Sequence, residues 1–428
     1  KLAVLPFGKS GVVSASMLGL GRALGETMAV LMILSPGLNY SVKLLQASQN
    51  QTIAANIAAQ YPEANDLGVS VLIGTGLVLF LITFVVNFIA RKLSECVMTA
   101  ANNDASPMDG APVIDFDKFK PTRSFTSARK RKDFAMKALI SCAFIVALIP
   151  LFSVLLTTII NGVKRLNLNF LSYNMTGVVG GNPTPSGGYG GILHAIIGTL
   201  EITFGAMLIS IPIGLMCAVY LVEYSNRGKL AQVITLLVDV MSGIPSIVAG
   251  LFAFSMFTIL IGPGTINGFE GSVALSLLML PTVVKSSEEM LKIVPHDLRE
   301  ASYALGVTKQ RTITKIVLRT ALPGIVSGAI LAVARVIGET APLLMTAGYI
   351  ASTNVNLFSG QMTTLPVYVY QEYSKLNANC PANASAACVT TIPMERAWAA
   401  ALVLILIVLI LNLIGRLVAK VFAVKSER

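Results

Sequence analysis

The chain has 428 residues, of which 54% are hydrophobic and only 12% are charged, and its formal net charge is +11. A soluble domain carries about twice that charged fraction, so the composition excludes an ordinary soluble protein. The positive charge gathers between apolar runs, without interleaved aromatic residues, which argues against nucleic acid as a partner.

Eight long apolar stretches follow one another along the chain. Each is long enough to cross a bilayer core of about 30 Å. Proline and glycine interrupt the fourth to the seventh, which is typical of transporter helices that bend. The sequence therefore predicts an all-α, polytopic membrane protein surrounded by lipid, with about eight transmembrane helices. They are predicted at roughly 10–34, 68–90, 135–161, 192–222, 231–261, 272–291, 321–347 and 397–424.

A polar segment at 99–133 separates the second apolar stretch from the third. It is rich in Asn, Asp, Ala, Pro and Lys and lacks helical apolar periodicity up to a basic run, so we expect it to be largely disordered. The sequence from Met98 onward reads as a complete membrane protein. We therefore divide the chain into a first unit at 1–97, a cytoplasmic basic linker at 98–133 and a second, six-helix unit at 134–428.

Lysine and arginine are unevenly distributed among the connecting segments. Nine lie in 91–133 and six in 292–319, whereas 35–67 and 348–395 hold one each and 163–191 holds two. Cytoplasmic loops carry an excess of positive charge. The first two segments are therefore predicted to face the cytoplasm and the other three the outside.

Two of the five cysteines, Cys380 and Cys388, lie in one predicted outer loop. Disulfides persist in that compartment, so we expect these two to pair, with two free thiols as the alternative. The chain has only two histidines and no metal-ligand spacing. We therefore expect no metal site and no cofactor.

Residues 4–30 align without a gap with residues 317–343. In this alignment Arg22 matches Arg335 and Glu26 matches Glu339, and each copy is followed by a polar outer loop and one final apolar stretch. A period this long indicates the duplication of a whole protein rather than a solenoid. The first unit therefore reads as the C-terminal third of a protein similar to the second unit.

Arg335 and Glu339 are four residues apart in a predicted helix, which places them on one face. A charge near the bilayer centre costs a few kcal/mol at minimum, so such residues are candidates for a transport pathway. A guanidinium suits a tetrahedral oxyanion, and a carboxylate accepts the O–H of hydrogen phosphate but repels sulfate. We assign Arg22, Glu26, Arg335 and Glu339 to a substrate pathway, with a structural ion pair as the alternative. Lys285 is a further candidate anion contact, or else a lysine that reaches the membrane interface.

The basic segment 292–319 reads as two short helices joined at Gly306, which fits the left-handed residue that ends the first. Leu298, Ala301, Ser302 and Leu305 recur at helical spacing, which predicts one face that docks into a groove of a partner.

Glu300-Ala301-Ser302, Gly306 and Ile316-Val317-Leu318 together resemble the EAA motif of ABC importer permeases, although Ser302 and Arg319 replace the usual Ala and Pro. Residues 242–250, 280–295 and 334–344 resemble the PstA permeases of phosphate-specific (Pst) importers, and the resemblance covers about 134–428. Residues 1–92 resemble the C-terminal third of their partner, PstC.

The resemblance implies the type I ABC importer permease fold in a bacterial cell membrane, with inorganic phosphate as the cargo. It implies that the EAA-type loop couples the permease to an ATP-binding subunit dimer of the PstB type. It also implies a PstC-like second permease and an extracytoplasmic phosphate-binding protein as partners.

Three alternatives stay open: an ABC permease for another oxyanion or small solute, an ion-coupled secondary carrier, and a membrane sensor without transport. No Gly-x-x-x-x-Gly-Lys-Ser/Thr pattern occurs, so we expect the chain not to hydrolyse ATP and not to be an enzyme.

Overall fold

The computed structural model describes residue 19, residue 23 and residues 25–33, 51–103, 127–184, 188–225, 228–375, 380 and 388–422. The regular elements in these ranges are all helical, which confirms the predicted class. In chain order they are α2 (Met28–Ile33), α3 (Ile53–Gln60), the 3-10 turn η1 (Tyr61–Glu63), α4 (Asp66–Asn103), α5 (Ser127–Val163), α6 (Leu168–Ser172), α7 (Leu193–Val219), the π-helical turn η3 (Tyr220–Tyr224), α8 (Lys229–Ser242), α9 (Ser246–Leu260), α10 (Gly268–Ile293), α11 (His296–Ala304), α12 (Lys309–Thr312), the π-helical turn η4 (Ile313–Val317), α13 (Leu318–Val336), α14 (Ala341–Thr346), α15 (Leu365–Ser374) and α16 (Ile392–Phe422).

Within the described ranges, six spans are long and apolar enough to cross a membrane. They comprise α4, α5, α7 with η3, α10, the run from α12 to α13, and α16. α8 and α9 pass the same test as a pair, although the chain bends by 110° between them. Seven of the eight predicted stretches therefore have helical counterparts. The stretch predicted at 10–34 lies mostly outside the described residues, so the count of eight stays a prediction.

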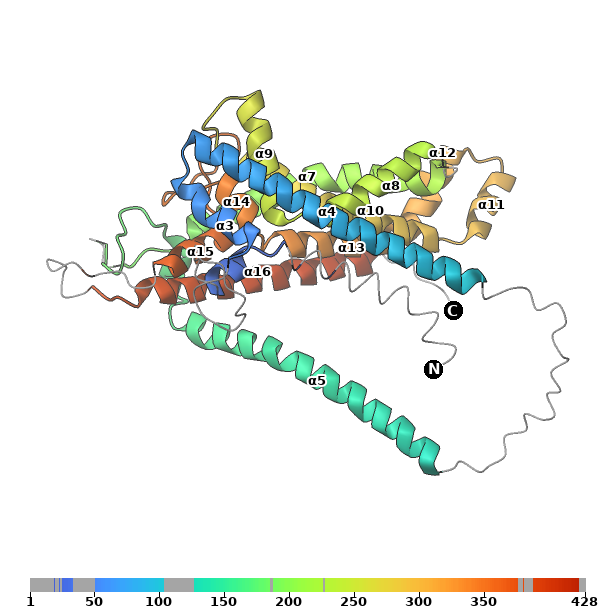
Figure 1. Cartoon of the computed structure of the whole chain (residues 1–428), viewed down its shortest axis with the longest axis horizontal. Helices are drawn as coiled ribbons and strands as arrows, with labels where there is room; N and C mark the ends of the chain where they lie inside the picture. The colour runs from blue at the N-terminus through green and yellow to red at the C-terminus, as the bar shows by residue number, and fades with distance from the viewer. Residues whose placement is uncertain are drawn as a thin grey trace.

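α10 lies in the middle of the bundle and is the most enclosed of the six spans (Figure 1), with 67% of its most apolar window buried inside the chain. Small side chains allow its neighbours to approach closely. Ser272 Oγ of α10 donates to the carbonyl of Ile202 on α7 at 3.0 Å. Gly328 of α13 lies against Ser286 of α10. α10 is therefore the element on which α7 and α13 are assembled.

α5 is the least enclosed of the six spans, since none of its most apolar window is buried inside the chain. Figure 1 shows it running apart from the other long helices and approaching them near its Val163 end. There, Gly162 lies against Leu402 and the backbone of Trp398 on α16. The rest of this apolar helix faces away from the bundle.

The bend between α8 and α9 lies at residues 243–245. Pro245 has no N–H for a helical hydrogen bond and disfavours helical geometry in the residue before it, so α8 ends and α9 starts afresh. The first unit packs at this bend. A Cβ atom on Gly25 would lie 2.9 Å from Cα of Pro245, and Ile57 and Leu72 share one buried cluster with Leu251.

The predicted linker is shorter than expected. α4 continues to Asn103 and α5 begins at Ser127, so both ends of the segment predicted at 98–133 are helical. Alanine, lysine and arginine at these ends are good helix formers, and they extend the helices that the apolar stretches begin. Residues 104–126, for which we expected disorder, lie outside the described residues.

Candidate substrate pathway and coupling loop

The two copies of the Gly-Glu-Thr segment flank the start of the same helix, α9. Gly25 of the first copy contacts Pro245. Pro342, which closely follows the second copy, contacts Gly250 one turn further along α9. The two copies of the repeat predicted from the sequence therefore both contact residues 245–250.

The first-copy charges are only partly described. Arg22 lies outside the described residues. Glu26 follows Gly25 and is exposed, while its neighbour Thr27 is buried and donates through Oγ1 to the carbonyl of Gly25 at 3.1 Å. The assignment of Arg22 and Glu26 to a pathway stays a prediction.

Arg335 lies in the last turn of α13, is half-buried and faces α10. Its Nη1 donates to Oγ1 of Thr282 at 3.4 Å. The basic end of α13 thus reaches across to a hydroxyl of the most enclosed helix. A guanidinium between two predicted membrane helices is suited to bind a tetrahedral anion.

The helical geometry predicted for Glu339 is wrong. α13 ends at Val336, and α14 begins at Ala341, so Glu339 lies in the break and not one helical turn beyond Arg335. Pro342 and Gly338 both favour the break, because Pro342 cannot donate a hydrogen bond to the carbonyl of Gly338 and glycine is a poor helix former. The half-buried Glu339 is held instead by a turn, in which its N–H donates to the carbonyl of Val336 at 3.0 Å.

Lys285 has a partner that the sequence reasoning missed. Its Nζ lies 2.8 Å from Oδ1 of Asp239 on α8 and 3.4 Å from Oγ of Ser242. Lys285 is one helical turn from Thr282, so the contacts of Arg335 and Lys285 follow one another along α10. Asp239 could have been identified from the sequence, since it is an acidic residue in a predicted membrane stretch.

The coupling loop has the two predicted helices, α11 and α12. Gly306 adopts φ +74°, the left-handed conformation expected where α11 ends. Leu298, Glu300 and Ala301 are exposed on α11, and Leu305 is exposed directly after it. This exposure is what a docking helix requires.

Ser302 does not belong to the predicted docking face. It is buried, and its Oγ lies 2.8 Å from Oγ1 of Thr312, so it holds α11 against the second half of the loop. The small hydroxyl fits where a buried donor can meet a buried acceptor. The other three members of the predicted face remain exposed.

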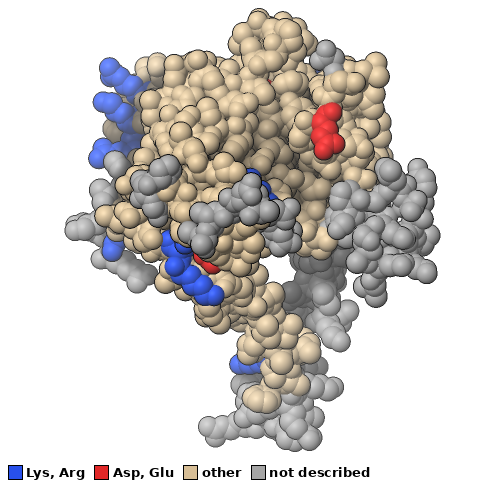
Figure 2. Space-filling model, turned by 90° about the vertical axis from the view of Figure 1, so that its left-hand side faces the viewer, with Lys and Arg blue, Asp and Glu red and all other residues tan. Residues whose placement is uncertain are grey.

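The opposite, predicted outer end of the molecule is held by a buried ion pair. Most of this face is uncharged (Figure 2). Beneath it, Arg396 of α16 is fully buried and contacts Glu372 of α15, with Nε donating to Oε2 at 2.7 Å. Its Nη1 and Nη2 donate to the carbonyls of Tyr189 at 2.8 Å and Gly180 at 3.0 Å. Arg396 therefore joins α15 and α16 to the loop before α7.

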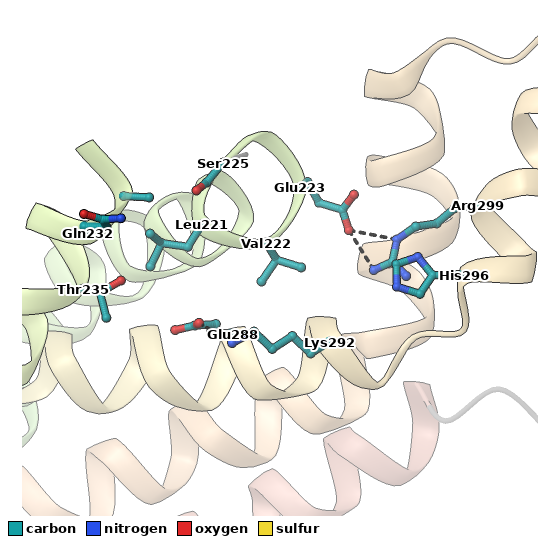
Figure 3. A pocket seen from close by; sticks show the side chains of 11 residues that line it. Leu221, Val222, Glu223, Ser225, Gln232, Thr235, Glu288, Lys292, His296 and Arg299 are labelled. Atoms are coloured by element: carbon teal, nitrogen blue, oxygen red, sulfur yellow. Dashed lines mark hydrogen bonds and ion pairs between the residues drawn. The ribbon is translucent and has the colours of Figure 1, made fainter. Parts of the chain in front are cut away.

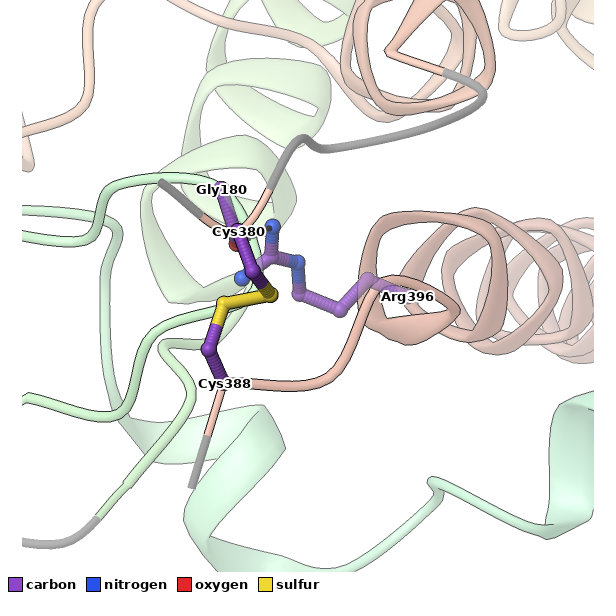
Figure 4. Close-up of a disulfide and its surroundings, with 4 residues drawn as sticks. All are labelled: Gly180, Cys380, Cys388 and Arg396. Carbon is purple, nitrogen blue, oxygen red and sulfur yellow. Dashed lines mark hydrogen bonds between the residues drawn. A yellow bond between two sulfur atoms is a disulfide. The ribbon is translucent and has the colours of Figure 1, made fainter. Parts of the chain in front are cut away.

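Cys380 and Cys388 form a disulfide beside this cluster (Figure 4), with an S–S distance of 2.08 Å. Val389, next to Cys388, donates through its N–H to the carbonyl of Gly181 at 3.1 Å. A Cβ atom on Gly181 would overlap the carbonyl of Val389, so the two loops meet closely only because this residue is glycine. Val389 therefore attaches the disulfide to the segment that also binds Arg396.

We predict that this disulfide forms in the cell, on the outer side of the membrane. On intact cells, a membrane-impermeant maleimide should label neither Cys380 nor Cys388 until a reductant is added. The double variant Cys380→Ser with Cys388→Ser corrects for labelling at the other cysteines. Full labelling before reduction would contradict the pairing.

Residues 210–425 match the family described as binding-protein-dependent transport system inner membrane component. The chain is 42% identical over 316 residues to the phosphate transport system permease protein PstA 1 of Mycobacterium tuberculosis (strain CDC 1551 / Oshkosh), covering 73% of this chain and 97% of that protein. It is 36% identical over 291 residues to the phosphate transport system permease protein PstA of Haemophilus influenzae, covering 68% of this chain and 94% of that protein.

A solved structure of a bacterial ABC transporter involved in the import of the acidic polysaccharide alginate is similar at 14% identity and a TM-score of 0.47, over 68% of this chain and 96% of that chain. The family match and the relatives above confirm the resemblance to the PstA permeases, whereas the resemblance of the first unit to PstC stays a prediction. The chain belongs to the family of binding-protein-dependent transport system inner membrane components and is a multi-pass membrane protein.

Proposed function

We propose that the chain is the PstA-type permease of an ATP-driven importer of inorganic phosphate. The observation that carries this proposal is the identity of 42% with a phosphate permease, 97% of which is covered. We further propose that residues 1–97 are the C-terminal part of a PstC-like permease. Their support is the repeat in the sequence and the packing of Gly25 on Pro245.

Phosphate binding is assigned to Arg335 with Glu339, and to Arg22 with Glu26 in the first unit. Arg335 supplies charged N–H donors in a half-buried position beside Thr282, whose hydroxyl is also able to bind an oxyanion. Glu339 supplies the acceptor that hydrogen phosphate can satisfy and sulfate cannot. Lys285, held by Asp239, is the next cation along α10 and a second contact for the anion.

The proposed partners are those that the resemblance to Pst permeases implies. An ATP-binding subunit dimer of the PstB type docks on α11 through the exposed Glu300 and Ala301. A PstC-like permease completes the pathway, and an extracytoplasmic phosphate-binding protein delivers the anion. ATP hydrolysis belongs to the separate subunit, since the relatives are named as permeases.

Uptake of radiolabelled phosphate tests the proposal in cells that lack other phosphate importers and express the whole system. Uptake should require ATP and should persist in excess sulfate or molybdate. Competition by either anion would favour a permease for another oxyanion. Uptake that follows an ion gradient and survives without the ATP-binding subunit would favour a secondary carrier.

Glu300→Lys is expected to lower uptake by about tenfold or more, because a reversed charge at the centre of a docking surface weakens binding of the partner. Glu63→Lys is the matched control, since Glu63 is an exposed carboxylate in η1, on the predicted outer side. The amount of ATP-binding subunit that copurifies with each variant shows whether docking is the cause. Normal uptake and normal copurification in Glu300→Lys would remove Glu300 from the coupling surface.

A further inference from the structure

A buried arginine fixes α11 to the end of a membrane helix. Arg299 lies in the middle of α11, and its side chain is 9% exposed. Its Nε and Nη2 both donate to Oε1 of Glu223, at 3.1 and 2.8 Å (Figure 3). Glu223 belongs to η3, the turn that continues α7, and its side chain is 6% exposed. Neither residue was predicted to be functional from the sequence.

The same guanidinium also binds the end of α10. Nη1 donates to the carbonyl of Val294 at 2.6 Å, and Nη2 donates to the carbonyl of Leu291 at 3.0 Å. Carbonyls at the C-terminal end of a helix have no donor within the helix, so these two bonds satisfy them. One side chain of α11 therefore holds both α7, through η3, and α10.

A second contact fixes α11 to the helix that carries Arg335. Ser302 is bonded to Thr312, and Thr312 leads directly into η4 and α13. The loop is thus attached to three membrane helices, namely α7, α10 and α13. These helices pack on one another in a single buried core, and two of them carry Thr282, Lys285 and Arg335.

A neighbouring ion pair lies within a single helix and joins no two elements. Lys292 and Glu288 both belong to α10, one helical turn apart, and Lys292 is 61% exposed. They line the same pocket of about 670 Å³ as Arg299 and Glu223 (Figure 3). An exposed pair within one helix transmits no force between elements, whereas a buried pair between two elements resists their separation.

We propose that Arg299 and Glu223 are positioning residues of the transport cycle. Their ion pair carries the displacement of α11, imposed by the ATP-binding subunit, to α7, and the other two bonds of Arg299 carry it to α10. The contacts to Leu291 and Val294 set the distance of α11 from α10, and the contact to Glu223 makes α7 move with it. This inference rests on the proposed function, because it needs an ATP-binding subunit that docks on α11.

The test compares transport with hydrolysis in vesicles that contain the whole complex and phosphate-loaded binding protein. Glu223→Gln removes the charge but leaves Arg299 its two carbonyl acceptors on α10, so α11 stays attached on that side. The phosphate transported per ATP hydrolysed is expected to fall about tenfold, which is a usual size for coupling between sites. ATP hydrolysis per assembled complex is expected to change by less than about twofold, since the docking face is untouched.

Arg299→Lys is the second variant, because it keeps a charge but loses the planar fork, and the same ratio is expected to fall. Glu223→Asp keeps the charge and is expected to retain more of the ratio than Glu223→Gln. Lys292→Gln is the matched control and is expected to leave the ratio unchanged.

A purely structural role would lower hydrolysis and uptake together and leave their ratio as in the unmodified complex. An unchanged ratio in Glu223→Gln overturns the inference about Arg299 and Glu223 and leaves the proposed function standing. If Glu223→Gln does not assemble, an unchanged ratio in Arg299→Lys has the same meaning. Absence of ATP-dependent uptake in the unmodified complex would overturn the proposed function and this inference with it.

Discussion

Arg335→Gln is expected to lower phosphate uptake by about a hundredfold or more. Charge-assisted hydrogen bonds contribute about 1.5–3 kcal/mol each, and a guanidinium offers two to an oxyanion. The loss of both corresponds to about two powers of ten or more in the rate at which the anion passes this point. Initial rates of radiolabelled phosphate uptake measure the effect.

Three variants accompany this measurement. Arg335→Lys keeps the charge without the fork and should retain part of the uptake. Arg416→Gln removes an exposed arginine near the C-terminal end of α16 and should transport normally. Glu339→Gln should lose uptake or become sensitive to sulfate, because it removes the acceptor that discriminates between the anions. Normal uptake in both Arg335→Gln and Glu339→Gln would remove these residues from the pathway.

Arg396→Ala is expected to lower the free energy of unfolding by about 3–5 kcal/mol, since it removes the buried partner of Glu372 and leaves this fully buried carboxylate only the half-exposed Lys375, at 2.8 Å. Arg396 and Glu372 are both fully buried, and the carbonyls of Gly180 and Tyr189 lose their donors as well. Trp398 is the only tryptophan of the chain and lies two residues from Arg396. Its fluorescence during denaturant titration of the detergent-solubilised protein reports the change.

The adjacent residue provides the control. Glu395 pairs with Arg165 at 3.8 Å, and the two side chains are 35% and 21% exposed. Glu395→Gln should therefore cost less than about 1 kcal/mol, as is usual for partly exposed pairs. An equal, small cost in Arg396→Ala and Glu395→Gln would mean that the buried pair does not hold the outer loops together.

Much of the fold was predictable, because it depends on properties that single segments carry. Apolar length identified the membrane helices, and the basic segments identified their predicted orientation. The bend at Pro245 and the left-handed Gly306 follow from the chemistry of those two residues alone. Each of these predictions used only residues that are close together in the sequence.

The candidate site was less predictable, because its contacts join residues that are far apart in the chain. Asp239 and Lys285 meet across two helices, as do Glu223 and Arg299. Helical spacing gave no information about either pair, and it misplaced Glu339, whose helix is interrupted by the effect of Pro342. Ser302 was misread for a related reason, since its partner Thr312 lies on the next helix.

The contrast between α5 and α10 bears on how the chain enters the membrane. α5 has a mean hydropathy of 2.7 and no buried residue in its apolar window, so we expect it to partition from the translocon into lipid without help from other helices. α10 has a mean hydropathy of only 1.2 and exposes Ser, Glu and Lys side chains until α7 and α13 surround it. Since α7 is synthesised before α10 and α13 after it, we expect α10 to stay beside α7 until α13 emerges. Biogenesis of the second unit would then start with an autonomous anchor, and α10 would enter lipid only together with its neighbours.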